Sequence, residues 1–287
     1  MNSPHAWIEA LECDGSLDEP ARLRERAEVL DRLETWFSSE RDAEAGEHGL
    51  HHRAMAVRTR LEAINHCVYA ELREGLRCGR GGGLLLRWAD QQRQRGVDGY
   101  DHLDDLLAGV LPFDPPDDVA DPPAEMVFYQ PTPARHIFDL IRRTALTADD
   151  VVVDIGAGLG HVPLLVALCT RARAIGIERE AAFVTRARQC AAALNLSRVG
   201  FIEQDARTAD FSTGTVFYLY TPFSGSILRS VLGSLRQESS HRGIRVCTYG
   251  PCTEVVANES WLSAAEPVEA NRVAVFRSRD CDALDPG

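Results

Sequence analysis

"VVVDIGAGLGHV" (residues 151–162) is the stretch of the chain that decides its fold. Three β-branched residues indicate a buried strand, and glycines at positions 156, 158 and 160 then end it. Glycine has no Cβ, so it permits a tight turn, the close approach of a ligand and a close contact between helix and sheet. The pattern therefore predicts a strand, a ligand-binding loop and the start of a helix.

Strands and helices alternate on both sides of this loop. The expected strands are DVVVDIG (150–156), RAIGIE (173–178), VGFIEQD (199–205), TVFYLYTPF (215–223), IRVCTYG (244–250), WLSAAEP (261–267) and RVAVFRSR (272–279). Helical patterns separate the first five strands, except that none lies between the third and the fourth. This alternation predicts a parallel, doubly wound α/β sheet. No helix separates the last two strands, so they are expected to form an antiparallel hairpin at one edge.

The first part of the chain has a different pattern. Apolar side chains recur every three or four positions in residues 20–79, and shorter helices are expected over residues 84–95 and 100–111. Prolines and acids dominate residues 112–125, which cannot lie inside a helix or strand. The expected division is an all-helical N-terminal domain (1–113), a Pro/Asp-rich linker (114–126) and a ligand-binding domain (127–287). We expect the helices to form a cap over the carboxyl edge of the sheet.

Composition limits the partners of the chain. The net charge is −12 and no Lys occurs, and residues 1–120 carry 24 acidic side chains against 14 Arg, a net charge of −10. Nucleic acid is therefore disfavoured as a partner. No apolar run is long enough to span a bilayer and no signal peptide is evident, which predicts a cytoplasmic protein. The eight Cys lack a C-x-x-C pair, and the His cluster at 48–52 is interpreted as a polar helix start, so no metal site is predicted.

Two acidic residues are expected at the same edge of the sheet as the glycine loop. Glu178 ends the second strand, 18 residues after Gly160, where a carboxylate can accept hydrogen bonds from both hydroxyls of a ribose. Asp205 ends the third strand and can accept a hydrogen bond from an adenine amino group. The carboxyl ends of parallel strands are where open α/β sheets bind ligands.

These residues resemble the class I S-adenosylmethionine-dependent methyltransferases. Their first motif, D/E-x-G-x-G-x-G, corresponds here to Asp154, Gly156, Ala157, Gly158 and Gly160. Glu178 matches the ribose-binding acid of the family, and Asp205-Ala206 matches its adenine-contacting segment. The resemblance covers roughly residues 127–287 and implies a Rossmann-like fold with a seven-stranded sheet. It also implies S-adenosyl-L-methionine as cofactor and a transferase activity.

A nicotinamide-binding fold is the main alternative. Its G-x-G-x-x-G loop needs Gly or Ala where this chain has His161. Asp154 would also repel a pyrophosphate, whereas S-adenosylmethionine carries cationic ammonium and sulfonium groups that suit an acid. The residues therefore favour the methyl donor.

The segment FYQPTPARHIF (128–138) precedes the first strand. It resembles the segment that closes over the methionine end of the cofactor in several amino-methylating members of the family, which implies cofactor contacts for Tyr129 and Thr132. Thr132 is expected to cap the following helix. The alternative is a plain helix start in which two prolines direct the chain.

The acceptor site is expected beyond the fourth strand, where amino-methylating relatives often carry [N/D/S]-P-P-[Y/F]. This chain has Tyr220-Thr221-Pro222-Phe223, so the Pro-Phe end agrees and the first position does not. Tyr220, Thr221 and Phe223 are predicted substrate contacts, and Tyr220 and His136 are the candidate catalytic residues, His161 being a further candidate base. Core aromatics at a strand end remain the alternative. We predict a small-molecule acceptor, the alternatives being a protein or peptide acceptor and a non-catalytic relict fold.

Overall fold

The computed structural model of the chain describes residues 3–37, 48–91, 99–113, 125–269 and 271–279. Seven strands form one sheet in the order β3-β2-β1-β4-β5-β7-β6. They are β1 (Val151–Ile155), β2 (Arg173–Glu178), β3 (Val199–Glu203), β4 (Val216–Tyr220), β5 (Arg245–Tyr249), β6 (Leu262–Ala264) and β7 (Ala274–Ser278). Strands β1 to β5 are parallel, and β7 runs antiparallel between β5 and β6. The predicted Rossmann-like sheet with its terminal hairpin is confirmed.

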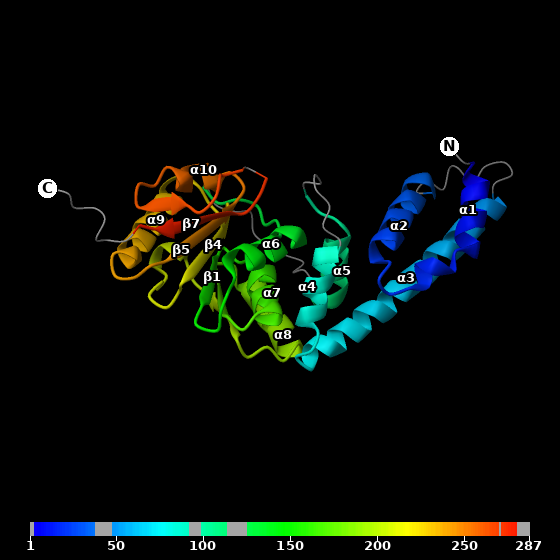
Figure 1. The fold of residues 1–287 in the computed structure, drawn as a ribbon, viewed down its shortest axis with the longest axis horizontal. Coiled ribbons are helices and arrows are strands. Elements are labelled where there is room, and N and C mark those ends of the chain that lie inside the picture. Colours follow the sequence, from blue (N-terminus) through cyan, green and yellow to red (C-terminus); the bar gives the residue numbers. More distant parts are fainter. Residues whose placement is uncertain (1–2, 38–47, 92–98, 114–124, 270, 280–287) are drawn as a thin grey trace.

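Helices cover both faces of the sheet (Figure 1). One face packs against α6 (Ala134–Thr144), α7 (His161–Cys169) and α8 (Ala181–Ala193), and the other against α9 (Gly225–Ser239) and α10 (Cys252–Ala257). Side chains alternate between the faces, so Val152 belongs to the first apolar cluster and Val153 to the second. Burial on both faces explains why the central strands are apolar without a polar alternation. The six-residue α10 was not predicted, because so short a helix shows little periodicity.

The N-terminal helices divide between two apolar clusters. They are α1 (Pro4–Cys13), α2 (Leu23–Phe37), α3 (His48–Arg77), α4 (Gly82–Gln91) and α5 (His102–Val110). The 30-residue α3 is roughly 45 Å long and contributes to both clusters. Its first half packs with α1 and α2, far from the sheet, whereas its last turns pack with α4 and α5 against α6 and α7 (Figure 1). The expected cap over the carboxyl edge is therefore not formed by α1 and α2.

The apolar cluster of the sheet includes Leu72, Leu85 and Leu106, so it continues across the predicted boundary at residue 113. The division into 1–113, 114–126 and 127–287 stays a prediction. Residues 114–124 of the expected linker lie outside the described residues. Among the described residues, no helix is long and apolar enough to cross a membrane.

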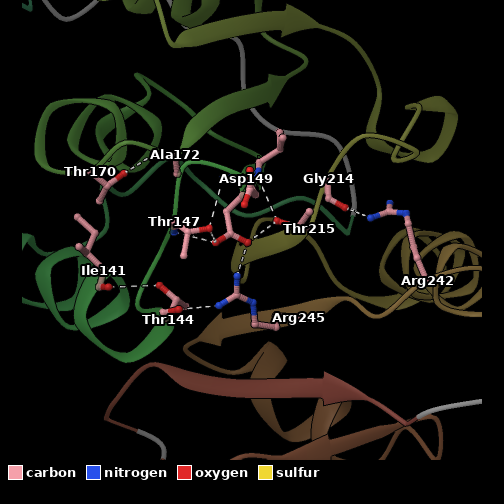
Figure 2. A network of polar contacts seen from close by, with 12 residues as sticks. Ile141, Thr144, Thr147, Asp149, Thr170, Ala172, Gly214, Thr215, Arg242 and Arg245 are labelled. Carbon is pink, nitrogen blue, oxygen red and sulfur yellow. Dashed lines mark hydrogen bonds and ion pairs between the residues drawn. The ribbon is translucent and has the colours of Figure 1, made fainter.

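A polar network closes the amino edge of the sheet, at the opposite end from the glycine loop. Asp150 accepts hydrogen bonds from Thr147 N–H (2.8 Å), Thr215 Oγ1 (2.8 Å) and Arg245 Nη2 (2.5 Å). Arg245 also donates to the carbonyl of Thr144 at the end of α6 (2.6 Å), as Figure 2 shows. The network therefore ties α6 to the start of β1, β4 and β5.

Candidate cofactor and acceptor site

The glycine loop (residues 156–160) joins the carboxyl end of β1 to α7. All three glycines have positive φ, at +83°, +53° and +81° for Gly156, Gly158 and Gly160, which L side chains rarely adopt. A Cβ built on Gly158 would lie 2.1 Å from the ring of Tyr129. The Tyr129 ring therefore lies directly against the bare backbone of Gly158.

The amide groups of the loop donate to the protein itself. The N–H groups of Gly156 and Ala157 donate to the carbonyl of Ile177 (2.9 and 3.0 Å), and that of Gly158 donates to the carboxylate of Glu178 (2.8 Å). A pyrophosphate at such a loop needs these N–H groups as donors. The loop therefore favours a ligand without phosphate groups.

Two buried carboxylates flank the loop, as the sequence predicted. Asp154 and Glu178 are 4% and 8% exposed. Burial, and then the negative charge of Glu178, raise the pKa of Asp154 to about 8. The second oxygen of Glu178 accepts from the N–H groups of Arg179 (2.7 Å) and Glu180 (2.9 Å), which fixes the carboxylate at the end of β2. A cation at this edge would relieve the cost of burying two like charges, so the site fits the ammonium and sulfonium of S-adenosylmethionine.

Asp205 and Ala206 follow shortly after β3, which ends at Glu203. The N–H of Gln204 donates to the carbonyl of Glu178 (2.9 Å), so Asp205 stands near the second strand end, as expected. Hydrogen bonds from Arg207, whose Nη2 lies 2.6 Å from the carboxylate, lower the pKa of Asp205 to about 2. This ion pair was not predicted. The adenine contact of Asp205-Ala206 stays a prediction.

Tyr129 connects the segment before α6 to the glycine loop. Its hydroxyl lies 3.3 Å from Nδ1 of His161, and its ring packs against Phe183 of α8 with centroids 4.7 Å apart. Burial lowers the pKa of His161 to about 4, so this imidazole is neutral at pH 7. The structure thus places the predicted cofactor residue Tyr129 on the cofactor loop, although its contact with a cofactor stays a prediction.

The prediction that Thr132 caps α6 is wrong. Pro133 occupies the cap position, and the N–H of Ala134 donates to Asp104 of α5 (2.8 Å). Proline has no polar side chain that could accept this hydrogen bond, so the carboxylate of Asp104 from another helix accepts it. Thr132 instead places its hydroxyl 3.2 Å from that of the buried Tyr218 on β4. The predicted contact between Thr132 and the cofactor stays a prediction.

Three side chains in ring contact at the carboxyl ends of β4 and β5, together with Tyr100, which contacts Pro131 beside them, form what we term the aromatic row: His136, Tyr249, Tyr220 and Tyr100. The rings of His136 and Tyr249 have centroids 4.0 Å apart, and those of Tyr249 and Tyr220 are 4.9 Å apart. His136 is 6% exposed and lies at the buried end of the row. Tyr220 is only partly buried, and the catalytic roles predicted for His136 and Tyr220 stay predictions.

Sequence reasoning missed Tyr249 and Tyr100. Tyr249 pairs in register with Tyr220, so the rule that sites form at strand ends was a usable signal for it. Tyr100 precedes α5 in the N-terminal part, and its hydroxyl donates to the carbonyl of Pro131 (2.7 Å). No sequence pattern indicated that contact.

Two other predicted substrate residues serve the structure. Phe223 is 4% exposed and belongs to the apolar cluster beneath α9, so the structure does not favour its predicted packing on an acceptor. Thr221, at a φ of +39°, donates its hydroxyl to the carbonyl of Tyr249 (3.1 Å) and accepts from the N–H of Cys252 (3.1 Å). Its hydroxyl is thus engaged in joining the ends of β4 and β5.

Comparisons with known proteins match part of the chain. Residues 146–219 match the family model described as a methyltransferase domain. No curated protein matches the chain. The chain is similar to the solved RNA methyltransferase from Salinibacter ruber in complex with S-adenosyl-L-homocysteine, with 24% identity, coverage of 55% of this chain and 100% of that one, and a TM-score of 0.44.

Two further solved structures are similar to part of the chain. A putative S-adenosyl-L-methionine-dependent methyltransferase from Methanococcus maripaludis is 11% identical, with 52% of this chain and 85% of that one covered and a TM-score of 0.44. A ribosomal protein L11 methylase from Lactobacillus delbrueckii subsp. bulgaricus is 15% identical, with 51% and 77% covered and a TM-score of 0.42.

The sheet order, the glycine loop and the two buried acids define a Rossmann-like α/β protein with a ligand site at the carboxyl edge of its sheet. The matched domain identifies the chemistry. Residues 146–219 therefore form a methyltransferase domain with the class I fold, for which S-adenosyl-L-methionine is the cofactor.

Proposed function

We propose that the chain methylates a small-molecule acceptor. The observation that carries this proposal is the position of Tyr100, which comes from the N-terminal part and lies against Pro131 at the acceptor edge. The protein thereby covers part of its own acceptor edge, which suits a small molecule better than a folded protein. Nucleic acid stays the less favoured partner because the net charge is −12. A cytoplasmic location is likewise proposed from the sequence.

The proposed roles follow from position and charge. Asp154 and Glu178 would hold the cationic and ribose parts of the cofactor, and Gly158 would let the predicted cofactor residue Tyr129 pack directly on the loop. The cofactor supplies an electrophilic methyl group when it is bound. Tyr220 would orient the acceptor, because burial raises its pKa and keeps the phenol neutral. Alignment of the reacting groups accounts for much of the acceleration in such a transfer.

Two measurements test this proposal. Calorimetry with S-adenosylhomocysteine and with NAD is expected to show binding of the first alone. Incubation of cell extract with methyl-labelled S-adenosylmethionine and the protein, followed by separation by size, is expected to place the label in the small-molecule fraction. Label in the protein or nucleic-acid fraction would overturn the acceptor class, and binding without any labelled product would favour a non-catalytic role.

A further inference from the structure

The angles within the aromatic row distinguish two kinds of ligand. The planes of His136 and Tyr249 are inclined by 31°, and those of Tyr249 and Tyr220 by 36°. Rings that bind a cation turn several faces toward one point, as in the aromatic cages for quaternary ammonium. Here successive rings are closer to parallel, so the row resembles a stack. A stack is extended by another flat ring.

The exposed end of the row is where such a ring has access. Exposure rises from the buried His136 to Tyr100, which is 45% exposed. The hydroxyl of Tyr100 donates to the carbonyl of Pro131, and the neighbouring Gln130 places its Oε1 atom 3.5 Å from the hydroxyl of Tyr220, so both phenols lie against the same short segment. Gly250, with a φ of +81°, lets the Tyr220 ring lie close to the loop after β5, because a Cβ there would be 3.3 Å from that ring. The absence of a side chain at Gly250 thus leaves room for the Tyr220 ring.

The groups around this end are neutral or already paired. Burial raises the pKa of Tyr100 to about 12 and also raises that of Tyr220. The nearby Arg135 forms an ion pair with Asp101. Gln130 places its Oε1 atom 3.5 Å from the hydroxyl of Tyr220, and its amide offers a donor and an acceptor in one plane. These groups suit an uncharged ring that carries a polar atom at its edge.

We infer that the aromatic row and Gln130 form the acceptor subsite, that this subsite binds a flat, uncharged heteroaromatic ring, and that Tyr100 determines its specificity. The inference rests on the proposed function, because it assigns the acceptor of the same reaction. It makes the segment before α5 part of the acceptor site. The ring belongs to a free compound, in keeping with the small-molecule acceptor proposed above. A base in a single strand of nucleic acid presents the same flat face, and the test distinguishes the two sources.

The test is a binding measurement in the presence of saturating S-adenosylhomocysteine. Saturation-transfer NMR titrations would compare quinoline, a flat heteroaromatic ring, with decahydroquinoline and tetramethylammonium, which are cationic and not flat. A single-stranded RNA decamer of mixed sequence forms a separate arm. The variants are Tyr100→Ala and Tyr220→Ala, with Tyr220→Phe to keep the packing. Phe128→Ala is the matched control, because Phe128 is 72% exposed and lies outside the row.

Quinoline is expected to bind the wild type more tightly than either cation. Loss of an aromatic stacking partner should weaken quinoline binding at least ~5-fold in Tyr100→Ala and in Tyr220→Ala. Quinoline binding should not change in Phe128→Ala. The same pattern with the decamer would support the flat-ring subsite but overturn the free compound as the source of the ring, in favour of a nucleic-acid base. Tighter binding of a cation, or unchanged binding in both alanine variants, would overturn it. Failure of S-adenosylhomocysteine to bind would contradict the proposed function instead, and the quinoline series in the free protein would still decide the inference.

Discussion

Among single residues, Gly158 is the position of the cofactor loop at which an added side chain would meet Tyr129. A Cβ there would lie 2.1 Å from the ring of Tyr129, on a backbone with a φ of +53°. We expect Gly158→Ala to weaken the binding of S-adenosylhomocysteine at least ~10-fold, because the methyl group displaces the Tyr129 ring from the loop and strains the backbone. Calorimetry measures this loss.

The matched control for this prediction is Gly233→Ala in α9. No atom lies within 4 Å of a Cβ built there, and alanine favours a helix by about 0.5–1 kcal/mol over glycine. This variant should keep the wild-type affinity and melt no earlier than the wild type. Equal affinity of Gly158→Ala and the wild type would show that the packing of Tyr129 on the loop does not support cofactor binding.

Asp154 predicts a pH dependence of cofactor binding. Its pKa in the unliganded protein is raised from 3.8 to about 8, first by burial and then by the charge of Glu178. The folded protein therefore holds a proton there between about pH 4 and pH 8 that the unfolded chain does not hold. This group thus favours the folded state most below about pH 4, and its contribution declines as the pH rises to 8.

A cationic ligand favours the charged carboxylate and lowers this pKa, so binding releases the proton. Affinity for S-adenosylmethionine should then rise with pH, by at most about tenfold per unit, and level off near pH 8. Calorimetry across pH 6 to 9 measures the slope, and buffers with different ionisation enthalpies count the released protons. Asp154→Asn should lack the part of the pH dependence that comes from the carboxylate. Titration of the ligand itself affects the wild type and the variant equally. Identical slopes for the wild type and Asp154→Asn would contradict the assignment of Asp154 to cofactor binding.

Among the elements, the Asp150 network joins α6 to the sheet at its amino edge. A substitution in this network should lower the stability of the protein without changing its affinity for the cofactor. Burial of Asp150 acts to raise its pKa, but hydrogen bonds from Thr147, Thr215 and Arg245 outweigh it, and the pKa is lowered from 3.8. The stability gained is present above pH 3.8 and is lost as the pH falls through the lower folded value. Asp150→Ala should reduce the unfolding free energy at pH 7 by about 2–4 kcal/mol.

Urea unfolding measures this difference, which should hold down to about pH 4 and narrow only as the pH is lowered below about 3.8. Asp149→Ala is the control, since the exposed side chain of Asp149 accepts no hydrogen bond among those described, and it should stay within about 0.5 kcal/mol of the wild type. S-adenosylhomocysteine affinity should be unchanged in both variants, because the network lies at the opposite end of the strands from the loop. A loss of affinity in Asp150→Ala alone would contradict that separation.

The sequence was sufficient for the elements whose signal is local. The strands followed from apolar runs broken by glycine, and Asp154 and Glu178 followed from their distance to those breaks. Contacts between distant parts of the chain were not predictable. Asp104 caps α6 from 30 residues away, which is why the cap was assigned to Thr132. Phe223 follows a strand as a site residue would, and only the packing of α9 shows that its ring is buried.

For the whole molecule, α3 links two apolar clusters that should respond separately to mutation. Leu33 and Leu106 are both fully buried, the first in the cluster of α1, α2 and the start of α3, the second in the cluster that includes the sheet. Each Leu→Ala substitution should cost about 2–5 kcal/mol in its own cluster. Leu33→Ala should leave S-adenosylhomocysteine affinity within about twofold of wild type, because its cluster does not reach the cofactor loop.

Hydrogen exchange followed by mass spectrometry locates the effect of each substitution. In Leu33→Ala, faster exchange is expected in α1, α2 and the first half of α3 alone. In Leu106→Ala it should appear in α5 and in the helices packed on the sheet, and quinoline binding should weaken because α5 follows Tyr100 directly. The two variants are matched in chemistry and burial, so a difference between them reflects position. Exchange that spreads from Leu33→Ala into the sheet would show that the chain unfolds as one cooperative unit.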